Sequence, residues 1–259
     1  MMKPRGVLLA GNWKMNHLQK DTISFLDALA PFLKTSQKPG SQMRLYIPAL
    51  SLEIASKKTK SESIPLQVGC QNAHYEKSGA FTGEISVPML KEIDIDQTLV
   101  GHSERRQYFG ETNDTVLKRT ISALEQDMEV LVCIGETLDE RNGGKMETVL
   151  QAQLDLLIQH ETSRNAFGKK LHIAYEPVWA IGTGVTATPV QAAEAHAFIR
   201  QLLEKRIGPD TANATRILYG GSVTPTNFKE LLACRDIDGG LVGGASLKIE
   251  GWTQLWALI

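Results

Sequence analysis

The chain has 259 residues, of which 42% are hydrophobic and 22% charged, a composition typical of a globular protein with a large buried core. Its formal net charge is -1, and its lysines and arginines are scattered, so we expect neither a nucleic acid nor a membrane surface as a partner. The apolar run Val7 to Ala10 behind the basic N-terminus is too short for a signal peptide, which predicts a cytoplasmic protein.

The three cysteines, Cys70, Cys133 and Cys234, are far apart and form no CxxC pair. We therefore expect reduced thiols, with neither a disulfide framework nor a zinc site. The sequence also has no cluster of residues with metal-ligand spacing, no Walker loop and no strand-linked GxGxxG. These features predict an enzyme without a metal or an organic cofactor.

Eight short apolar runs, each followed by a stretch of helical periodicity, recur from one end of the chain to the other. Such runs are typical of parallel strands buried between helices. In chain order they are Val7 to Ala10, Leu45 to Ile47, Leu66 to Val68, Thr98 to Val100, Val130 to Ile134, Leu171 to Tyr175, Ile217 to Tyr219 and Leu241-Val242.

Apolar residues at three-and-four spacing predict helices between these strands. The clearest are Thr22 to Lys34, Asp114 to Asp127, Lys145 to Gln159 and Thr188 to Lys205, with shorter ones at Thr224 to Leu232 and Ser246 to Leu258. Thr188-Pro189 combines a capping residue with a first-turn proline, and Gly208-Pro209 is expected to end the same helix.

Eight βα units fit either a closed barrel or an open doubly wound sheet. Polar residues and glycines follow nearly every strand, which a barrel with one site at its mouth requires, whereas an open sheet concentrates such residues at one switch point. No break in composition divides the chain. We therefore predict an α/β fold, a closed eight-stranded parallel (β/α)8 TIM barrel that forms a single domain over residues 1–259.

Glu176 directly follows a buried run, so its carboxylate is predicted at a strand end, where it could act as a general base. A structural ion pair is the alternative for a lone glutamate. The next segment, residues 177–184, combines a proline, large apolar side chains that we expect to be exposed, and two glycines. This pattern favours a lid that closes over a substrate, rather than a loop that only packs against a neighbour.

His102 opens a predicted short helix, whose positive end would disfavour an imidazolium. A neutral imidazole could then donate a hydrogen bond to a substrate carbonyl. Lys14 lies just past the first strand, where its ammonium could stabilise developing negative charge, and Asn12 could add a donor. Taken singly, an isolated histidine is usually structural, and the lysine motif is weak because lysines are common surface residues.

Two glycine pairs follow the seventh and eighth strands, Gly220-Gly221 before Ser222, and Gly243-Gly244. Barrels often bind phosphate at this place through backbone N–H groups and a helix N-terminus. Tight turns would explain either pair separately, but a phosphate site explains both pairs and their positions together.

Taken in order, these segments resemble the triosephosphate isomerase family over essentially the whole chain. The matching segments are GNWKMN at 11–16, QN at 71–72, GAFTGE at 79–84, GHSERR at 101–106, CIGET at 133–137, AYEPVWAIGTG at 174–184, YGGSV at 219–223 and VGGASL at 242–247. The family interconverts dihydroxyacetone phosphate and glyceraldehyde 3-phosphate through an enediol(ate), and it is itself the standard example of a glutamate base paired with a neutral histidine.

The resemblance implies a role for each matched residue. Glu176 would take the carbon-bound proton and His102 would shuttle protons between the oxygens, while Lys14 and Asn12 polarise the substrate with Glu104 as a supporting acid. The phosphate would be held by Gly182, Ser222, Gly243 and Gly244. The resemblance also implies a homodimer, in which Thr82 reaches the partner's Asn12 and His102.

Two other functions are compatible with the fold alone. A phosphate-binding barrel can be a sugar-phosphate epimerase or a lyase, because fold does not determine chemistry. Epimerases of that kind commonly need metal ligands on several strands, and the sequence has none. A protein that only binds a phosphorylated metabolite is expected to lose the base or the lid, and both motifs are present here.

Overall fold

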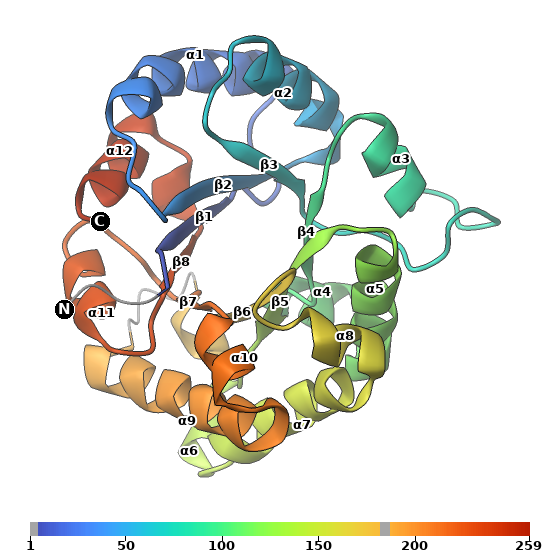
Figure 1. Cartoon of the computed structure of the whole chain (residues 1–259), viewed down its shortest axis with the longest axis vertical. Coiled ribbons are helices and arrows are strands. Elements are labelled where there is room, and N and C mark those ends of the chain that lie inside the picture. Colours follow the sequence, from blue (N-terminus) through green and yellow to red (C-terminus); the bar gives the residue numbers. More distant parts are fainter. Residues whose placement is uncertain (1–4, 182–186) are drawn as a thin grey trace.

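The computed structural model describes residues 5–181 and 187–259. Within them, eight parallel strands form a closed barrel in which each strand pairs with the next and β8 returns to β1 (Figure 1). The strands are β1 Leu8–Asn12, β2 Gln42–Ile47, β3 Gln67–Cys70, β4 Gln97–Val100, β5 Glu129–Ile134, β6 Leu171–Tyr175, β7 Ile217–Tyr219 and β8 Gly239–Val242. All eight predicted strands are confirmed, and the open sheet is excluded.

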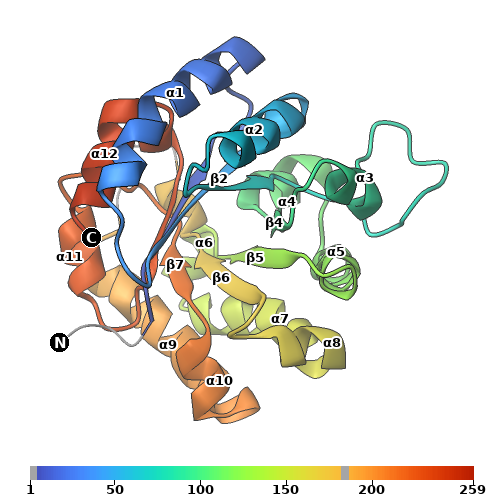
Figure 2. The same cartoon turned by 45° about the horizontal axis from the view of Figure 1, so that its top comes forward.

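The helices surround the barrel (Figures 1 and 2). They are α1 Gln19–Thr35, α2 Ala49–Ser61, α3 Val87–Glu92, α4 Ser103–Phe109, α5 Asn113–Glu125, α6 Leu138–Asn142, α7 Met146–Gln159, α8 Glu161–Ala166, α9 Pro189–Ile207, α10 Pro209–Ala214, α11 Phe228–Ala233 and α12 Ile249–Ala257, with short 3-10 turns η1 Val178–Ala180 and η2 Gly244–Ser246. None of the helices in the described part of the chain is both long and apolar enough to cross a membrane.

Local side-chain chemistry explains where the helices begin and end. The Thr188 hydroxyl accepts a hydrogen bond from the Gln191 N–H, which caps α9 as predicted. The helix ends at Ile207, just before Gly208, which has a φ of 87°. Helix α11 begins four residues later than the predicted start at Thr224. The reason is a turn in which the Asn227 side chain accepts from the Thr224 N–H and so competes with the helix.

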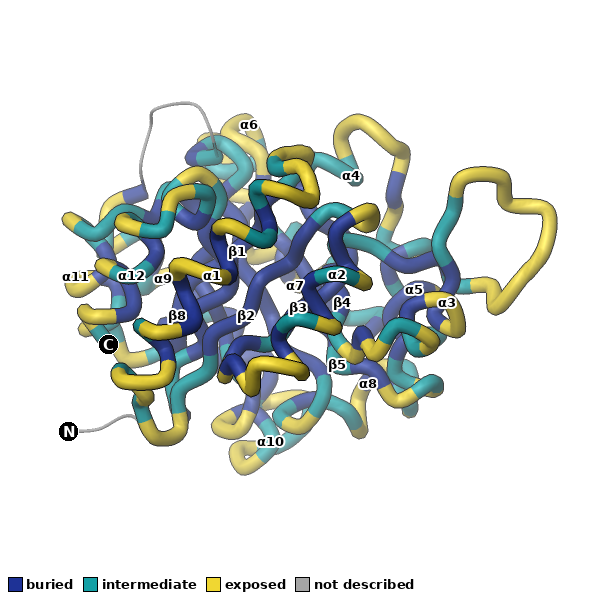
Figure 3. Tube along the Cα trace, turned by 90° about the horizontal axis from the view of Figure 1, so that it is seen from above, coloured by how far each residue is buried: buried dark blue, intermediate teal, exposed yellow. Residues whose placement is uncertain are grey.

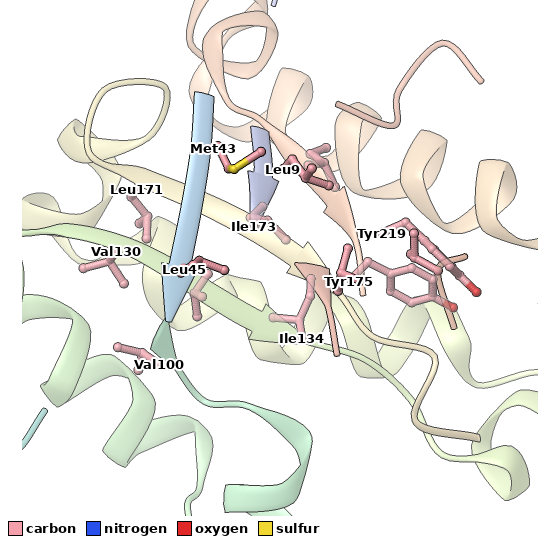
Figure 4. Close-up of a cluster of buried hydrophobic side chains, with 14 of the residues drawn as sticks. Leu9, Met43, Leu45, Val100, Val130, Ile134, Leu171, Ile173, Tyr175 and Tyr219 are labelled. Carbon is pink, nitrogen blue, oxygen red and sulfur yellow. The ribbon is translucent and has the colours of Figure 1, made fainter. Parts of the chain in front are cut away.

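Alternate residues of each strand build two apolar layers. One set faces the helices and forms the main core, including Leu9, Leu45 and Ile173 (Figure 4). The other set fills the barrel interior and consists of Leu8, Ala10, Tyr46, Leu99, Leu131, Cys133, Ala174, Leu218 and Leu241. Because the interior is packed, ligands have access only to the two ends of the barrel.

The interior changes character at the amino ends of β2, β5, β6 and β7, where inward-facing positions are polar. Arg44 is fully buried and pairs with Glu129 at 2.5 Å, and Arg216 donates to the Gln42 side chain at 2.6 Å. The Nδ1 atom of buried His172 accepts from the Arg216 N–H at 3.2 Å. Burial, together with the charges of Arg216 and Arg44, lowers the pKa of His172 to about 3.

The low pKa of His172 predicts a loss of stability in acid. Between the ordinary pKa of 6.5 and the folded value of about 3, the unfolded chain binds a proton that the folded chain excludes, so stability falls as the pH falls. In His172→Gln this contribution is absent, and the difference in slope should approach about 1.4 kcal/mol per pH unit. Urea unfolding at constant protein concentration, between pH 6.5 and 4.5, measures this difference.

A matched variant, His160→Gln, removes a half-buried histidine outside the barrel interior and controls for the loss of one histidine. Equal pH slopes in wild type and His172→Gln would contradict the interpretation.

Candidate active site

A cavity of about 400 Å³ lies at the carboxyl ends of the strands. Its lining contains seven of the predicted site residues, which come from five different strand ends. They are Asn12 at the end of β1 and Lys14 after it, His102 after β4, Glu176 after β6, Ser222 after β7, and Gly243 and Gly244 after β8. The structure therefore brings these seven side chains and backbone positions together at one mouth of the barrel.

Lys14 is held in a left-handed backbone conformation, with a φ of 52°. For a residue with a side chain this costs on the order of 1–3 kcal/mol, so surrounding contacts must enforce it. The Asn12 side chain accepts from the Lys14 N–H at 3.0 Å, and the Gln71 amide donates to the Lys14 carbonyl at 2.8 Å. The Lys14 ammonium points to the Glu104 carboxylate, 2.5 Å away. Glu104 thus lies outside the cavity lining but in contact with it.

Glu176 is almost fully buried, and both of its carboxylate oxygens are engaged. One oxygen lies 3.0 Å from Nε2 of His102, and the other accepts from the Ser103 N–H at 3.0 Å. Burial alone would raise the pKa of Glu176, but the His102 ring and the Ser103 N–H more than offset this effect and lower it. In this arrangement the carboxylate is ionised and restrained.

Glycines on the neighbouring strands make room for Glu176. A Cβ on Gly135 would lie 1.7 Å from the Glu176 carbonyl oxygen, and one on Gly220 would lie 2.8 Å from the Glu176 Cγ. Both positions therefore exclude side chains, which explains the glycine after β5 and one glycine of the pair after β7.

His102 caps helix α4, as its place before Ser103 predicts. Its Nδ1 accepts from the Glu104 N–H at 3.2 Å, so the neutral ring carries its proton on Nε2, the atom that faces Glu176. Burial lowers the pKa of His102, but the adjacent Glu176 carboxylate outweighs burial and raises it. The predicted neutral imidazole therefore requires a substrate that separates His102 from Glu176.

The predicted phosphate site occupies the side of the cavity formed by the ends of β7 and β8. Ser222, Gly243 and Gly244 all line it, and a Cβ on Gly243 would lie 3.6 Å from Cε of Lys14. The turn η2 begins at Gly244, and a Cβ there would meet no atom within 4 Å, so this backbone faces open space. Gly182, the fourth predicted phosphate ligand, lies outside the described residues.

Thr82 lies away from this cavity, on an exposed arm of residues 75–85. A bridge between His74 and Ser86 closes the base of the arm, which projects from the barrel between β3 and α3 (Figures 2 and 3). Thr82 therefore does not act in the cavity of its own chain as the structure stands.

A buried carboxylate that received no role from the sequence anchors the start of the predicted lid. Glu136 is fully buried after β5, and one of its oxygens accepts from the Tyr175 hydroxyl at 2.9 Å and from the Trp179 indole at 3.1 Å. Burial raises its pKa, which these donors partly offset. The signal in the sequence was a charged residue one glycine after an apolar run, similar to the signal that singled out Glu176.

The described part of the lid, Pro177 to Ile181, corrects one expectation. Its apolar side chains are not exposed: Val178, Trp179 and Ile181 are half-buried and Ala180 is buried. Trp179 is held down by Glu136, and Ile181 lines the cavity. The segment therefore packs onto the mouth of the barrel.

Among the described residues, no group of three or more His, Cys, Asp or Glu side chains is arranged to hold a metal ion.

Comparison with known proteins agrees with this geometry. A family model described as triosephosphate isomerase matches residues 7–259. The triosephosphate isomerase of Cytophaga hutchinsonii is 45% identical over 97% of this chain and 98% of its own length. Those of Aquifex aeolicus and Solibacter usitatus are 44% and 46% identical, over 96% and 95% of this chain and 97% and 96% of their own lengths. The chain therefore belongs to the triosephosphate isomerase family.

Proposed function

We propose that the cavity at the carboxyl ends of the strands is the active site, and that Glu176 is the base that moves the proton between adjacent carbons. As a member of its family, the protein is an aldose–ketose isomerase that interconverts dihydroxyacetone phosphate and glyceraldehyde 3-phosphate, a step of glycolysis and gluconeogenesis. The observation that carries the proposed site is the convergence of a buried carboxylate, an imidazole and an ammonium on one cavity.

The base becomes strong only when it leaves its present partners. His102 and the Ser103 N–H hold Glu176 in its ionised form, which weakens it as a base. A substrate that binds between Glu176 and His102 would remove that stabilisation while burial remains, so the pKa of the carboxylate would rise. The base strength would therefore be linked to substrate binding.

The other residues would stabilise the enediolate oxygens. Separated from Glu176, His102 would be neutral, because the Glu104 N–H already occupies Nδ1, and its Nε2–H would then donate to the substrate oxygens. The Lys14 ammonium and the Asn12 amide would stabilise the negative charge that develops there. Glu104 keeps Lys14 oriented, and Gly182, Ser222, Gly243 and Gly244 would bind the phosphate.

We also propose a homodimer in the cytoplasm, with the arm as part of the interface. The arm carries Phe81, whose side chain is partly exposed. Met15, beside the cavity, is 97% exposed, and Leu50 is also largely exposed. Burying such side chains against a second copy would remove apolar surface from water. Thr82 would then reach Asn12 and His102 of the partner subunit.

Shortening the base tests the role of Glu176. Glu176→Asp retracts the carboxylate by about 1 Å, and a displacement of this size can reduce the rate about 100-fold. A coupled spectrophotometric assay on chelator-treated protein measures turnover, with the exposed Glu161→Asp as the matched control and circular dichroism to verify folding. Near-wild-type turnover of the Glu176 variant would remove this residue from the mechanism.

Replacing the imidazole of His102 distinguishes its role as a hydrogen-bond donor from its role in proton transfer. His102→Gln keeps an N–H donor but cannot shuttle protons, so kcat should fall about 100- to 10,000-fold while KM changes little. Steady-state kinetics in both directions measure this. An unchanged kcat would contradict the role of His102, and a large rise in KM alone would assign it to binding.

Dilution tests the dimer. If Thr82 completes the site of the partner, specific activity should fall in proportion to the monomer fraction, as followed by analytical ultracentrifugation at the same concentrations. A fully monomeric sample with normal turnover would exclude a contribution of the arm to catalysis.

A further inference from the structure

A second cavity lies at the amino ends of the strands, at the opposite end of the barrel from the candidate active site. Its volume is about 360 Å³, close to the 400 Å³ of the candidate active site. Its polar lining comes from Arg5, Gln42, Glu129, Lys169, His172, Asn213 and Arg216. None of these residues lines the candidate active site, and the packed interior of the barrel separates the two cavities.

The charges around this cavity do not balance. Arg5 and Arg200 share the carboxylates of Asp236 and Asp238. Arg44 uses Glu129. Arg216 and Lys169 line the cavity, and neither has a carboxylate within ion-pair distance among residues 5–181 and 187–259. The group thus carries two positive charges more than negative ones.

The partners of Arg216 are neutral. Its guanidinium donates to the Gln42 amide at 2.6 Å, which uses only one of its five N–H groups. Burial, followed by the like charge of Arg44, lowers its pKa more than the Glu129 and Asp238 carboxylates raise it. An anion in the cavity would supply the missing charge.

His172 adds a neutral donor to the same cavity. Its Nδ1 accepts a hydrogen bond from the backbone N–H of Arg216, so the ring proton is on Nε2. In the part of the chain that the structure describes, the hydrogen bond of this ring is the one at Nδ1, and none is donated by Nε2. Because His172 faces inward beside Arg216, its Nε2–H extends the donor set formed by Arg216 and Lys169.

We propose that this cavity binds a small doubly charged oxyanion of the phosphate type, held by Arg216, His172 and Lys169. Arginine presents parallel N–H groups that match two oxygens of such an anion, and the charge of two equals the local excess. The Glu129 carboxylate also lines the cavity, but its ion pair with Arg44 offsets most of its charge. Because the cavity is remote from the catalytic one, the anion stabilises the fold without competing with substrate.

Binding of inorganic phosphate tests the proposal in a background where the candidate active site is disabled. Lys14→Met removes the ammonium of that site, and phosphate is then titrated by isothermal calorimetry and by thermal unfolding at constant ionic strength. We expect phosphate to bind and raise the Tm in this background. Adding Arg216→Gln should weaken the remaining binding at least about tenfold, because a charge-assisted hydrogen bond is lost.

Two further variants keep the test decisive if Arg216→Gln folds poorly. Lys169→Gln changes an exposed side chain and should weaken phosphate binding several-fold, whereas Arg164→Gln removes an exposed arginine that does not line the cavity and should leave most of the binding intact. In the wild-type background, Lys169→Gln should leave isomerase turnover unchanged. Absence of binding in Lys14→Met, or equal binding in the Lys169 and Arg164 variants, would overturn the proposal.

Discussion

Closure of the barrel at the seam between β1 and β8 is the constraint on which the site depends. Leu8 pairs with Gly239, whose φ is 149°, and a Cβ on that glycine would lie 1.9 Å from the Leu8 carbonyl oxygen. Only glycine allows the last strand to approach the first so closely. This seam places Lys14, which follows β1, beside Gly243, which follows β8, although more than two hundred residues separate them in the chain.

Within the closed barrel, the catalytic candidates are arranged by opposing contacts. Hydrogen bonds to Asn12 and Gln71 stabilise the strained backbone of Lys14. An ion pair with Glu104 orients its ammonium. Glu176 is buried, which favours its neutral form, yet His102 and the Ser103 N–H keep it ionised. In such a site, a substrate that displaces one of these contacts changes the charge balance of the other groups.

The two ends of the barrel use the same interior in different ways. Apolar side chains such as Leu131 and Leu218 fill its middle, and polar side chains occupy both ends. At the carboxyl ends the polar groups point into the candidate active site. At the amino ends, pairs such as Arg44 with Glu129 satisfy most of the charge, and Arg216 is left with neutral partners. Closing the middle with packed side chains isolates these two polar regions from each other.

The eight strands, the main helices and the place of seven candidate site residues at the carboxyl ends of the strands could be predicted from the sequence, because they depend on local periodicity and on the residue types at the end of each strand. The predicted start of α11 was four residues too early, since the competing Asn227 turn is a side-chain effect that periodicity does not carry. The sequence also predicted exposed side chains at Val178 and Trp179, which contact with the barrel mouth half-buries. These burials, the contact between Glu176 and His102, and the charge imbalance at Arg216 were established only by the folded barrel. Each arises from residues that are distant in the chain and meet only when the barrel closes.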